Sequence, residues 1–244
     1  MKLFAHRGLS SIFPENTLAA FRACTDHGVN WIETDVNILG DGTVVVIHDS
    51  HLERTTNASG SIYNLTAADL DYIDAGAWFS TEMAGERVPT LAELIQLMNQ
   101  TGLNANIEIK SNEQGAARTR ELMSGVLREL EALRPEREVI ISSFNHLILA
   151  ELKRLAPQYR VAALMTKEMM GADWRSVLEL IGAETIHLES RGLTENHVKK
   201  VKDAGFAINV WTVNEGERAS QLKNWGVDGV ISDYAHAFRE LEHS

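Results

Sequence analysis

The stretch VIISSFNHLILAELKRLAPQYRVAALM, residues 139–165, decides the fold. Its β-branched run Val139–Phe144 is typical of a buried strand, and the amphipathic run His146–Leu155 has the apolar spacing of a helix. A second short apolar run, Val161–Met165, completes a strand–helix–strand unit. Because parallel neighbours need a crossover of about a dozen residues, usually a helix, this unit predicts two parallel strands of one sheet.

The same alternation extends along the rest of the chain. Six further runs are predicted strands: Leu3–His6, Trp31–Val36, Ala105–Lys110, Thr185–Ser190, Ala207–Val213 and Gly229–Asp233. The amphipathic stretches between them are predicted helices: Asn16–His27, Leu91–Thr101, Ala116–Leu133, Trp174–Ile181, Thr194–Ala204 and Gly216–Trp225. Eight strands separated by helices favour a (β/α)8 TIM barrel, an α/β fold that commonly uses about 250 residues as one domain. An open doubly wound sheet is the alternative, and no linker divides residues 1–244.

One additional apolar run, Thr43–Asp49, lies too close to the preceding strand for a parallel crossover. Only Gly40-Asp41-Gly42 separates the two, so they are expected to form a hairpin. Folding back at this turn would bring His48 near Asp35. Residues 50–90 then form a small insertion before the next helix, and we expect it on the catalytic face, where long loops of a barrel often carry function.

Composition and charge exclude several classes of protein. The chain has 34 acidic and 23 basic residues and a net charge of -11, which disfavours nucleic acid and anionic lipid surfaces as partners. No run approaches the roughly 20 apolar residues that cross a bilayer, and the first residues lack the apolar stretch of a signal peptide. The single cysteine, Cys24, allows no internal disulfide. We therefore expect a cytoplasmic protein without membrane insertion.

Acidic side chains gather on two of the predicted strands. Glu33 and Asp35 lie two residues apart and therefore share one face of their strand, as do Glu108 and Lys110 on the next. Inward positions near the C-terminal ends of barrel strands build the active site. Three carboxylates there would suit Mg²⁺ or Ca²⁺ better than zinc. The alternatives are a hydrogen-bonded acidic pair at a strand end and a lysine that merely neutralises Glu108.

Two histidines end strands close to these acids. His6 ends the first strand and is followed by Arg7 and Gly8, while His48 ends the hairpin strand. Imidazole transfers protons near neutral pH, and a guanidinium binds phosphate with a planar fork. Glycine permits a sharp turn, so Arg7 could point into the site although it alternates with His6. One strand-end histidine is usually structural, but two beside a carboxylate cluster and an arginine favour catalysis.

Two ring-bearing side chains on late strands have either a structural or a ligand-binding interpretation. Trp211 ends a strand, where it could contact an apolar part of a ligand or simply fill the barrel. His187 could face inward near the same end of the barrel.

These residues occur in the order found in a known family. The motifs are His6-Arg7-Gly8, Pro14-Glu15-Asn16-Thr17, Ile32-Glu33-Thr34-Asp35-Val36, Val46-Ile47-His48-Asp49, Ile107-Glu108-Ile109-Lys110, Val210-Trp211-Thr212-Val213-Asn214 and Gly226-Val227-Asp228-Gly229-Val230-Ile231. Together they resemble the glycerophosphodiester phosphodiesterase family, in its bacterial cytosolic type, from residue 3 to about residue 233. One departure is Ser232-Asp233-Tyr234-Ala235, where the family commonly has Thr-Asp-Tyr/Phe-Pro. The lost proline is expected to loosen the chain there without touching a proposed catalytic group.

The resemblance implies a (β/α)8 barrel with a small inserted segment and assigns roles to eight side chains. It implies His6 and His48 as the acid–base pair, with Arg7 and Lys110 facing the phosphate. The resemblance also implies that Glu33, Asp35 and Glu108 bind the metal ion, which would be Mg²⁺ or Ca²⁺, with Mn²⁺ also suitable. It places Trp211 on the side of the site that binds the alcohol.

The implied reaction is hydrolysis of a small glycerophosphodiester, such as a deacylated phospholipid headgroup, to glycerol 3-phosphate and an alcohol. One alternative is lysophospholipase D activity on the same scaffold, which would need a groove for an acyl chain. The other is a non-catalytic module that binds a phosphodiester or a metal, although two histidine proton shuttles argue against it. Neither the preferred alcohol nor the oligomeric state follows from the residues.

Overall fold

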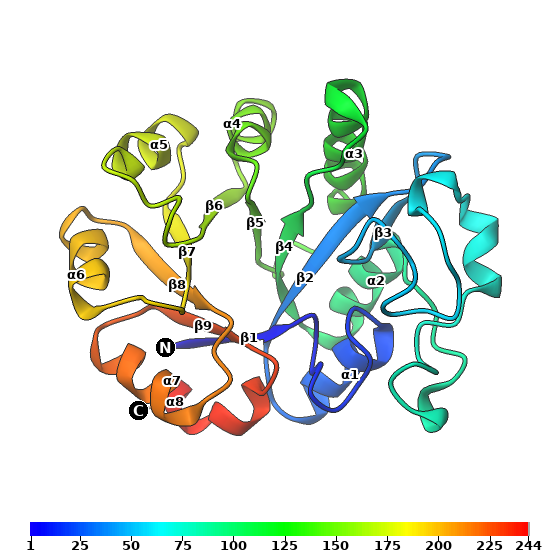
Figure 1. Ribbon diagram of the computed structural model, residues 1–244, viewed down its shortest axis with the longest axis horizontal. Helices are drawn as coiled ribbons and strands as arrows, with labels where there is room; N and C mark the ends of the chain where they lie inside the picture. The colour runs from blue at the N-terminus through cyan, green and yellow to red at the C-terminus, as the bar shows by residue number, and fades with distance from the viewer. Residues whose placement is uncertain (244) are drawn as a thin grey trace.

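Eight parallel strands close into a barrel in the computed structural model, which describes residues 1–243 (Figure 1). The barrel strands are β1 (Lys2–His6), β2 (Trp31–Ile38), β4 (Asn104–Ile109), β5 (Val139–Ser143), β6 (Arg160–Met165), β7 (Thr185–Glu189), β8 (Ala207–Trp211) and β9 (Gly229–Ser232). Strand β1 pairs with both β2 and β9, which closes the sheet. The predicted (β/α)8 barrel is therefore confirmed, and the open sheet is wrong. Ser244, the last residue of the predicted domain, lies outside the described residues.

Helices surround the strands on the outside of the barrel (Figure 1). They are α1 (Leu18–Asp26), α2 (Leu91–Thr101), α3 (Gly115–Leu130), α4 (His146–Leu155), α5 (Trp174–Ile181), α6 (Glu195–Asp203), α7 (Gly216–Asn224) and α8 (Glu240–His243). Helix α2 shows why these segments are helical: Thr90 and Glu93 form a reciprocal capping box, and Gly102 ends the helix in the left-handed region.

Helix α1 begins later than the sequence pattern predicted. Asn16 has a backbone φ of 56°, which a helix does not allow, and Thr17 caps the helix by accepting a hydrogen bond from the Ala20 N–H at 3.3 Å. Asn16 is thereby released from the helix. Its side chain turns to the acidic strand β2 instead, as described below.

The extra run forms the predicted hairpin. Strand β3 (Val44–Val46) pairs antiparallel with β2, and Val46 lies opposite Val36. Beyond the strand, the Ile47 N–H donates to the Asp35 carbonyl at 3.1 Å. This register carries His48 to the end of β2 that bears Asp35.

Residues 50–90 form the insertion, which contains three short 3₁₀ helices, η1 (Ile62–Asn64), η2 (Ala67–Tyr72) and η3 (Thr81–Met83). Its apolar side chains form a small core of their own with the hairpin. The members of this core include Leu39, Val45, Ile47, Leu52, Ile62, Leu70, Ile73, Ala75 and Val88. The hairpin and the insertion therefore support each other and hold the segment that carries His48.

Apolar side chains also fill the barrel beneath the inward polar residues. Phe4 and Trp31 lie two residues before His6 and Glu33, so they point to the same inner face. Their rings meet edge to face at a centroid distance of 5.2 Å. The C-terminal ends of the strands, here called the mouth, therefore lie above a layer of packed apolar side chains inside the barrel.

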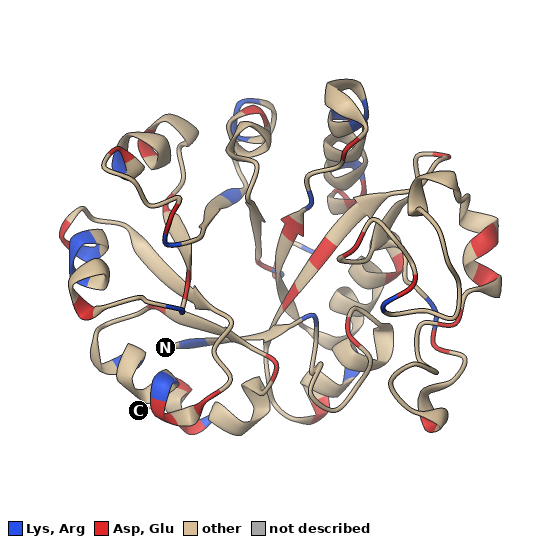
Figure 2. Cartoon of the chain, viewed as in Figure 1, with Lys and Arg blue, Asp and Glu red and all other residues tan. Residues whose placement is uncertain are grey.

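Charged residues of both signs are spread over the surrounding helices, and acidic segments also mark strands β2 and β4 (Figure 2). Within residues 1–243, none of the helices combines the length and apolar character required to span a bilayer.

The turn after β1 gives a test of the packing. A Cβ at Gly8 would lie 2.7 Å from the Ala20 Cβ, and Gly8 has a φ of 82°. Gly60 has a φ of 100° but open space around it. Both Gly→Ala variants incur left-handed strain of about 1–2 kcal/mol, whereas Gly8→Ala adds an overpacking cost of about 1–3 kcal/mol. Urea denaturation should show the larger loss of unfolding free energy for Gly8→Ala, and equal losses would contradict the close approach to α1.

Candidate active site

Two neighbouring strands bring three carboxylates together at the mouth. Glu33 and Asp35 come from β2 and Glu108 from β4, where Glu108 lies directly opposite Asp35 in the strand register. One oxygen from each carboxylate lies within 4.8 Å of the other two. All three residues are buried, with exposed fractions of 4%, 1% and 7%. The sequence prediction that these three side chains share one place is borne out by the geometry.

Two cations lie against the triad. The Arg7 Nε is 3.3 Å from Asp35 Oδ2, and its backbone N–H donates to Glu33 Oε2 at 3.3 Å. Lys110 Nζ donates to Glu108 Oε1 at 2.9 Å and lies 3.6 Å from Asp35 Oδ1. Arg7 reaches the site because its own backbone is left-handed, with a φ of 56°. Gly8 also has a positive φ, 82°, so the turn uses the expected glycine together with an unusual conformation of the arginine itself.

The charges of the triad are unequally compensated. Burial raises the pKa of Glu108 to about 7, and repulsion from Asp35 adds to this effect. Burial and the neighbouring carboxylates raise the pKa of Glu33 well above its usual range. Burial would also raise the pKa of Asp35, but Arg7 and Lys110 hold it at about 2. Arg7 and Lys110 therefore compensate the negative charge of Asp35 well, whereas the charges of Glu33 and Glu108 are only partly compensated.

This donor set fits a divalent cation. Three converging carboxylates supply hard oxygen ligands, the type that Mg²⁺, Ca²⁺ and Mn²⁺ prefer. The raised pKa of Glu33 and Glu108 shows that the buried charge is not fully offset by protein groups. Glu33, Asp35 and Glu108 are thus the residues that could hold the ion.

His6 lies on the Glu33 side of the triad. Its Nδ1 lies 2.6 Å from Asp233 Oδ1, and its Nε2 lies 3.9 Å from Glu33 Oε2. Asp233 also accepts hydrogen bonds from Ser10 Oγ at 2.9 Å and Asn214 Nδ2 at 2.7 Å. Burial opposes ionisation, but these partners hold the pKa of Asp233 at about 2. The aspartate therefore stays ionised and orients His6.

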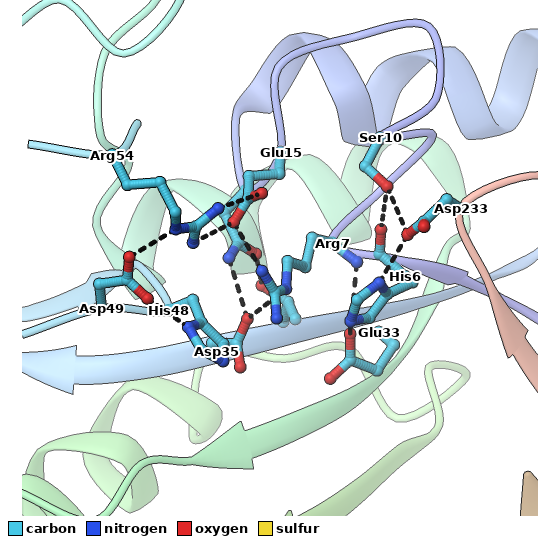
Figure 3. A network of polar contacts seen from close by, with 12 residues as sticks. His6, Arg7, Ser10, Glu15, Glu33, Asp35, His48, Asp49, Arg54 and Asp233 are labelled. Atoms are coloured by element: carbon cyan, nitrogen blue, oxygen red, sulfur yellow. Dashed lines mark hydrogen bonds and ion pairs between the residues drawn. The ribbon is translucent and has the colours of Figure 1, made fainter. Parts of the chain in front are cut away.

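His48 lies at the other end of the site (Figure 3). Its Nδ1 is 2.5 Å from Asp49 Oδ1, and Asp49 Oδ2 accepts a hydrogen bond from Arg54 Nε at 2.6 Å. Burial lowers the pKa of His48, the Asp35 carboxylate opposes that shift, and the positive charges of Arg7 and Lys110 add to it. Each histidine thus has an aspartate at Nδ1, but the partner of His48 shares its charge with a guanidinium.

Glu15 connects the two halves of the network (Figure 3), and Asn16 adds a contact to the triad. Glu15 accepts hydrogen bonds from Arg7 Nη1 at 2.8 Å and from Arg54 Nη1 and Nη2, also at 2.8 Å. Asn16 Nδ2 donates to Asp35 Oδ2 at 3.0 Å. Arg54 belongs to the insertion, so that segment is joined to the triad through three successive ion pairs, Arg54–Glu15, Glu15–Arg7 and Arg7–Asp35.

A cavity of about 380 Å³ borders His48 and Lys110. Polar side chains dominate its remaining lining, which consists of Asn37, Asp49, Ser50, His51, Ser111 and Glu113. Solvent can therefore approach the His48 end of the site.

Trp211 lies elsewhere on the mouth, at the end of β8. Its ring is half-buried, its Nε1–H donates to the His187 carbonyl at 3.1 Å, and it meets Phe144 at a centroid distance of 5.5 Å. His187 lies deeper, fully buried, with its Nε2 3.0 Å from Asn209 Nδ2. Burial lowers the pKa of His187 to about 3, so it remains a neutral core residue and not a proton-transfer group.

The structure gathers seven of the eight predicted residues into one network and places Trp211 on β8, which only β9 separates from β1. Several partners had no predicted role: Glu15, Asn16, Asp49, Arg54 and Asp233. Glu15, Asn16 and Asp49 lie inside the quoted motifs, and this position was the feature of the sequence that could have identified them as site residues. Asp233 could not be paired with His6 by spacing, because 227 residues separate them and only barrel closure makes them neighbours.

Comparison with known proteins agrees with this geometry. The model of the family described as Glycerophosphoryl diester phosphodiesterase matches residues 6–237. A glycerophosphodiester phosphodiesterase from Caldanaerobacter subterraneus subsp. tengcongensis is 35% identical over 231 residues, covering 95% of this chain and 93% of the relative. One from Bacillus altitudinis is 32% identical over 236 residues, covering 96% and 94%.

A solved structure is similar over the whole chain. It is an Oleispira antarctica phosphodiesterase in complex with the product sn-glycerol-3-phosphate, with a TM-score of 0.94 and 32% identity. The similarity covers 100% of this chain and 97% of that one. The chain therefore belongs to the glycerophosphoryl diester phosphodiesterase family, a family of phosphoric diester hydrolases.

Proposed function

We propose that this protein hydrolyses glycerophosphodiesters to glycerol 3-phosphate and an alcohol, with a divalent cation and two histidines. The observation that carries the proposal is the placement of three buried carboxylates, within 4.8 Å of one another, between two imidazoles that each have an aspartate partner. The product named for the Oleispira antarctica structure supports glycerol 3-phosphate as the retained half of a small-molecule substrate.

The metal ligands in this proposal are Glu33, Asp35 and Glu108. Mg²⁺ or Ca²⁺ is the expected ion, with Mn²⁺ also suited to the oxygen donors. When bound there, the ion would supply Lewis-acid stabilisation of negative charge on the phosphoryl group. Arg7 and Lys110 have N–H donors beyond those used in their ion pairs, and they offset further charge that develops as the phosphodiester reacts.

His48 is assigned as the general base and His6 as the general acid. His48 borders the polar cavity through which water reaches the site, and its aspartate partner is shared with Arg54. The partner of His6 receives its other hydrogen bonds from the neutral donors Ser10 and Asn214, so its negative charge is not shared with a second cation. A base and an acid at opposite ends of the site suit an in-line displacement, in which nucleophile and leaving alcohol lie on opposite sides of phosphorus.

The proposal extends to the setting of the enzyme. A deacylated headgroup diester is the expected substrate, and a cytoplasmic location is consistent with the free, buried Cys24. Residues 1–244 are treated as one domain, because Arg54 ties the insertion at 50–90 to Glu15 beside the barrel.

Removal of the metal should abolish turnover. We expect glycerol 3-phosphate release from glycerophosphoethanolamine to fall by at least about 100-fold after exhaustive EDTA treatment, because charge stabilisation at phosphorus contributes several kcal/mol. Addition of Mg²⁺, Ca²⁺ or Mn²⁺ in turn should restore activity and identify the preferred ion. Full activity after chelation would contradict the metal assignment. Binding of the diester without turnover under all conditions would favour a non-catalytic module, and faster turnover of a lysolipid would favour lysophospholipase D activity.

Substrates with different leaving groups separate the two histidines. Nitrophenolate leaves without a proton, so a general acid is dispensable for glycerol 3-(4-nitrophenyl phosphate). His6→Ala should therefore lose about 10²–10⁴-fold in kcat/KM on glycerophosphoethanolamine but much less on the nitrophenyl ester. His48→Ala should lose about 10²–10⁴-fold on both. The reverse pattern would exchange the two roles, and a mild effect of either variant on the natural diester would contradict acid–base catalysis at that residue.

A further inference from the structure

The mouth of the barrel has a second wall that the proposed reaction does not use. His187 and Asn209 contact each other inside the barrel, on β7 and β8. Glu189 and Trp211 come two residues later on the same strands, so their side chains share that inner face one layer closer to the mouth. The two residues are direct partners in the strand register. A carboxylate and an indole are thus neighbours at the rim.

Phe144, the residue that follows β5, completes this wall. Its ring meets Trp211 edge to face, with an interplanar angle of 89°. Both rings are half-buried, and the indole N–H is already bound to the His187 carbonyl. The two rings therefore offer hydrocarbon surface to the mouth with the indole donor already satisfied. Phe144, Glu189 and Trp211 are called the headgroup wall below.

Glu189 differs from the other carboxylates at the mouth. Its side chain is 17% exposed, and the ion pair found for it among residues 1–243 joins it to Arg191 at 3.3 Å. The Arg191 side chain is 84% exposed, so solvent screens the pair and it contributes little. By contrast, Asp35 and Asp233 are held by the partners described above, and Glu33 and Glu108 belong to the proposed metal site. Glu189 therefore retains negative charge that a ligand can use.

We propose that the headgroup wall binds the leaving alcohol and selects alcohols that carry an ammonium group, as ethanolamine and choline do. A cation is attracted to aromatic faces and to a partly desolvated carboxylate, and these occur together here. The inference rests on the proposed function, since it names the substrate class of that site.

The distribution of charge assigns the two halves of the substrate to opposite sides. Arg7 and Lys110 attract the phosphate to strands β1, β2 and β4, and they repel an ammonium group from that side. The headgroup wall begins on β8, with only β9 between it and β1, which carries His6. An alcohol bound at the wall therefore leaves next to the histidine assigned as general acid.

The test compares kcat/KM for three diesters: glycerophosphoethanolamine, glycerophosphocholine and glycerophosphoglycerol, whose leaving alcohol carries no charge. Glu189→Gln should lose about tenfold or more on both ammonium diesters, since a charge-assisted contact is removed. It should stay within about twofold on glycerophosphoglycerol. Glu195→Gln, an exposed glutamate on α6, is the matched control and should change none of the three. Equal losses on all three diesters, or no loss on any, would overturn the proposal.

Two further variants keep the test independent of folding defects. Arg191→Ala removes only a solvent-screened partner and should leave kcat/KM within about twofold on all three diesters, and a loss on the ammonium diesters as large as that of Glu189→Gln would count against the proposal. Trp211→Leu should penalise choline more than ethanolamine, because a quaternary ammonium depends on the aromatic face. Equal penalties would remove the aromatic contact from the proposal. Activity of the wild type on glycerophosphoglycerol reports on the proposed hydrolysis itself, so failure of that function is distinguishable from failure of the headgroup wall.

Discussion

Repulsion among three buried carboxylates at the mouth is the constraint on which the rest of the site depends. Glu33, Asp35 and Glu108 lie where desolvation and mutual repulsion both oppose ionisation, and Arg7 and Lys110 compensate mainly Asp35. Placing such a cluster in a protein interior is costly unless additional positive charge completes it. The fold tolerates this cost because apolar side chains inside the barrel and between its strands and helices stabilise it. The residues at the mouth are therefore not needed for packing.

The sequence predicted the barrel because strand and helix patterns alternate cleanly and each pattern is local. It also predicted which acids share a face, since a two-residue period on a strand needs no tertiary information. The left-handed Arg7 and the diverted Asn16 were not predicted, because their conformations are set by partners on β2. The pairing of His6 with Asp233 likewise depends on closure of the barrel and leaves no local signature in the sequence.

The insertion does more than extend the rim. Its small core packs on the hairpin, and Arg54 links it to both Asp49 and Glu15. The position of His48 therefore depends on a segment with little regular secondary structure, whereas His6 is held by barrel strands. One end of the site is therefore built on barrel strands and the other on loops. Substitutions in those loops can change how a substrate reaches the site without moving the triad.

Direct titration with Mn²⁺, followed by electron paramagnetic resonance, tests the central claim most directly because it needs no substrate and no turnover. The account expects one tight site per chain in the wild type, and at least about tenfold weaker binding in Glu108→Gln with the fold retained by circular dichroism. Unchanged Mn²⁺ affinity in folded Glu108→Gln, or absence of a site in the wild type, would contradict the claim that the triad holds the ion.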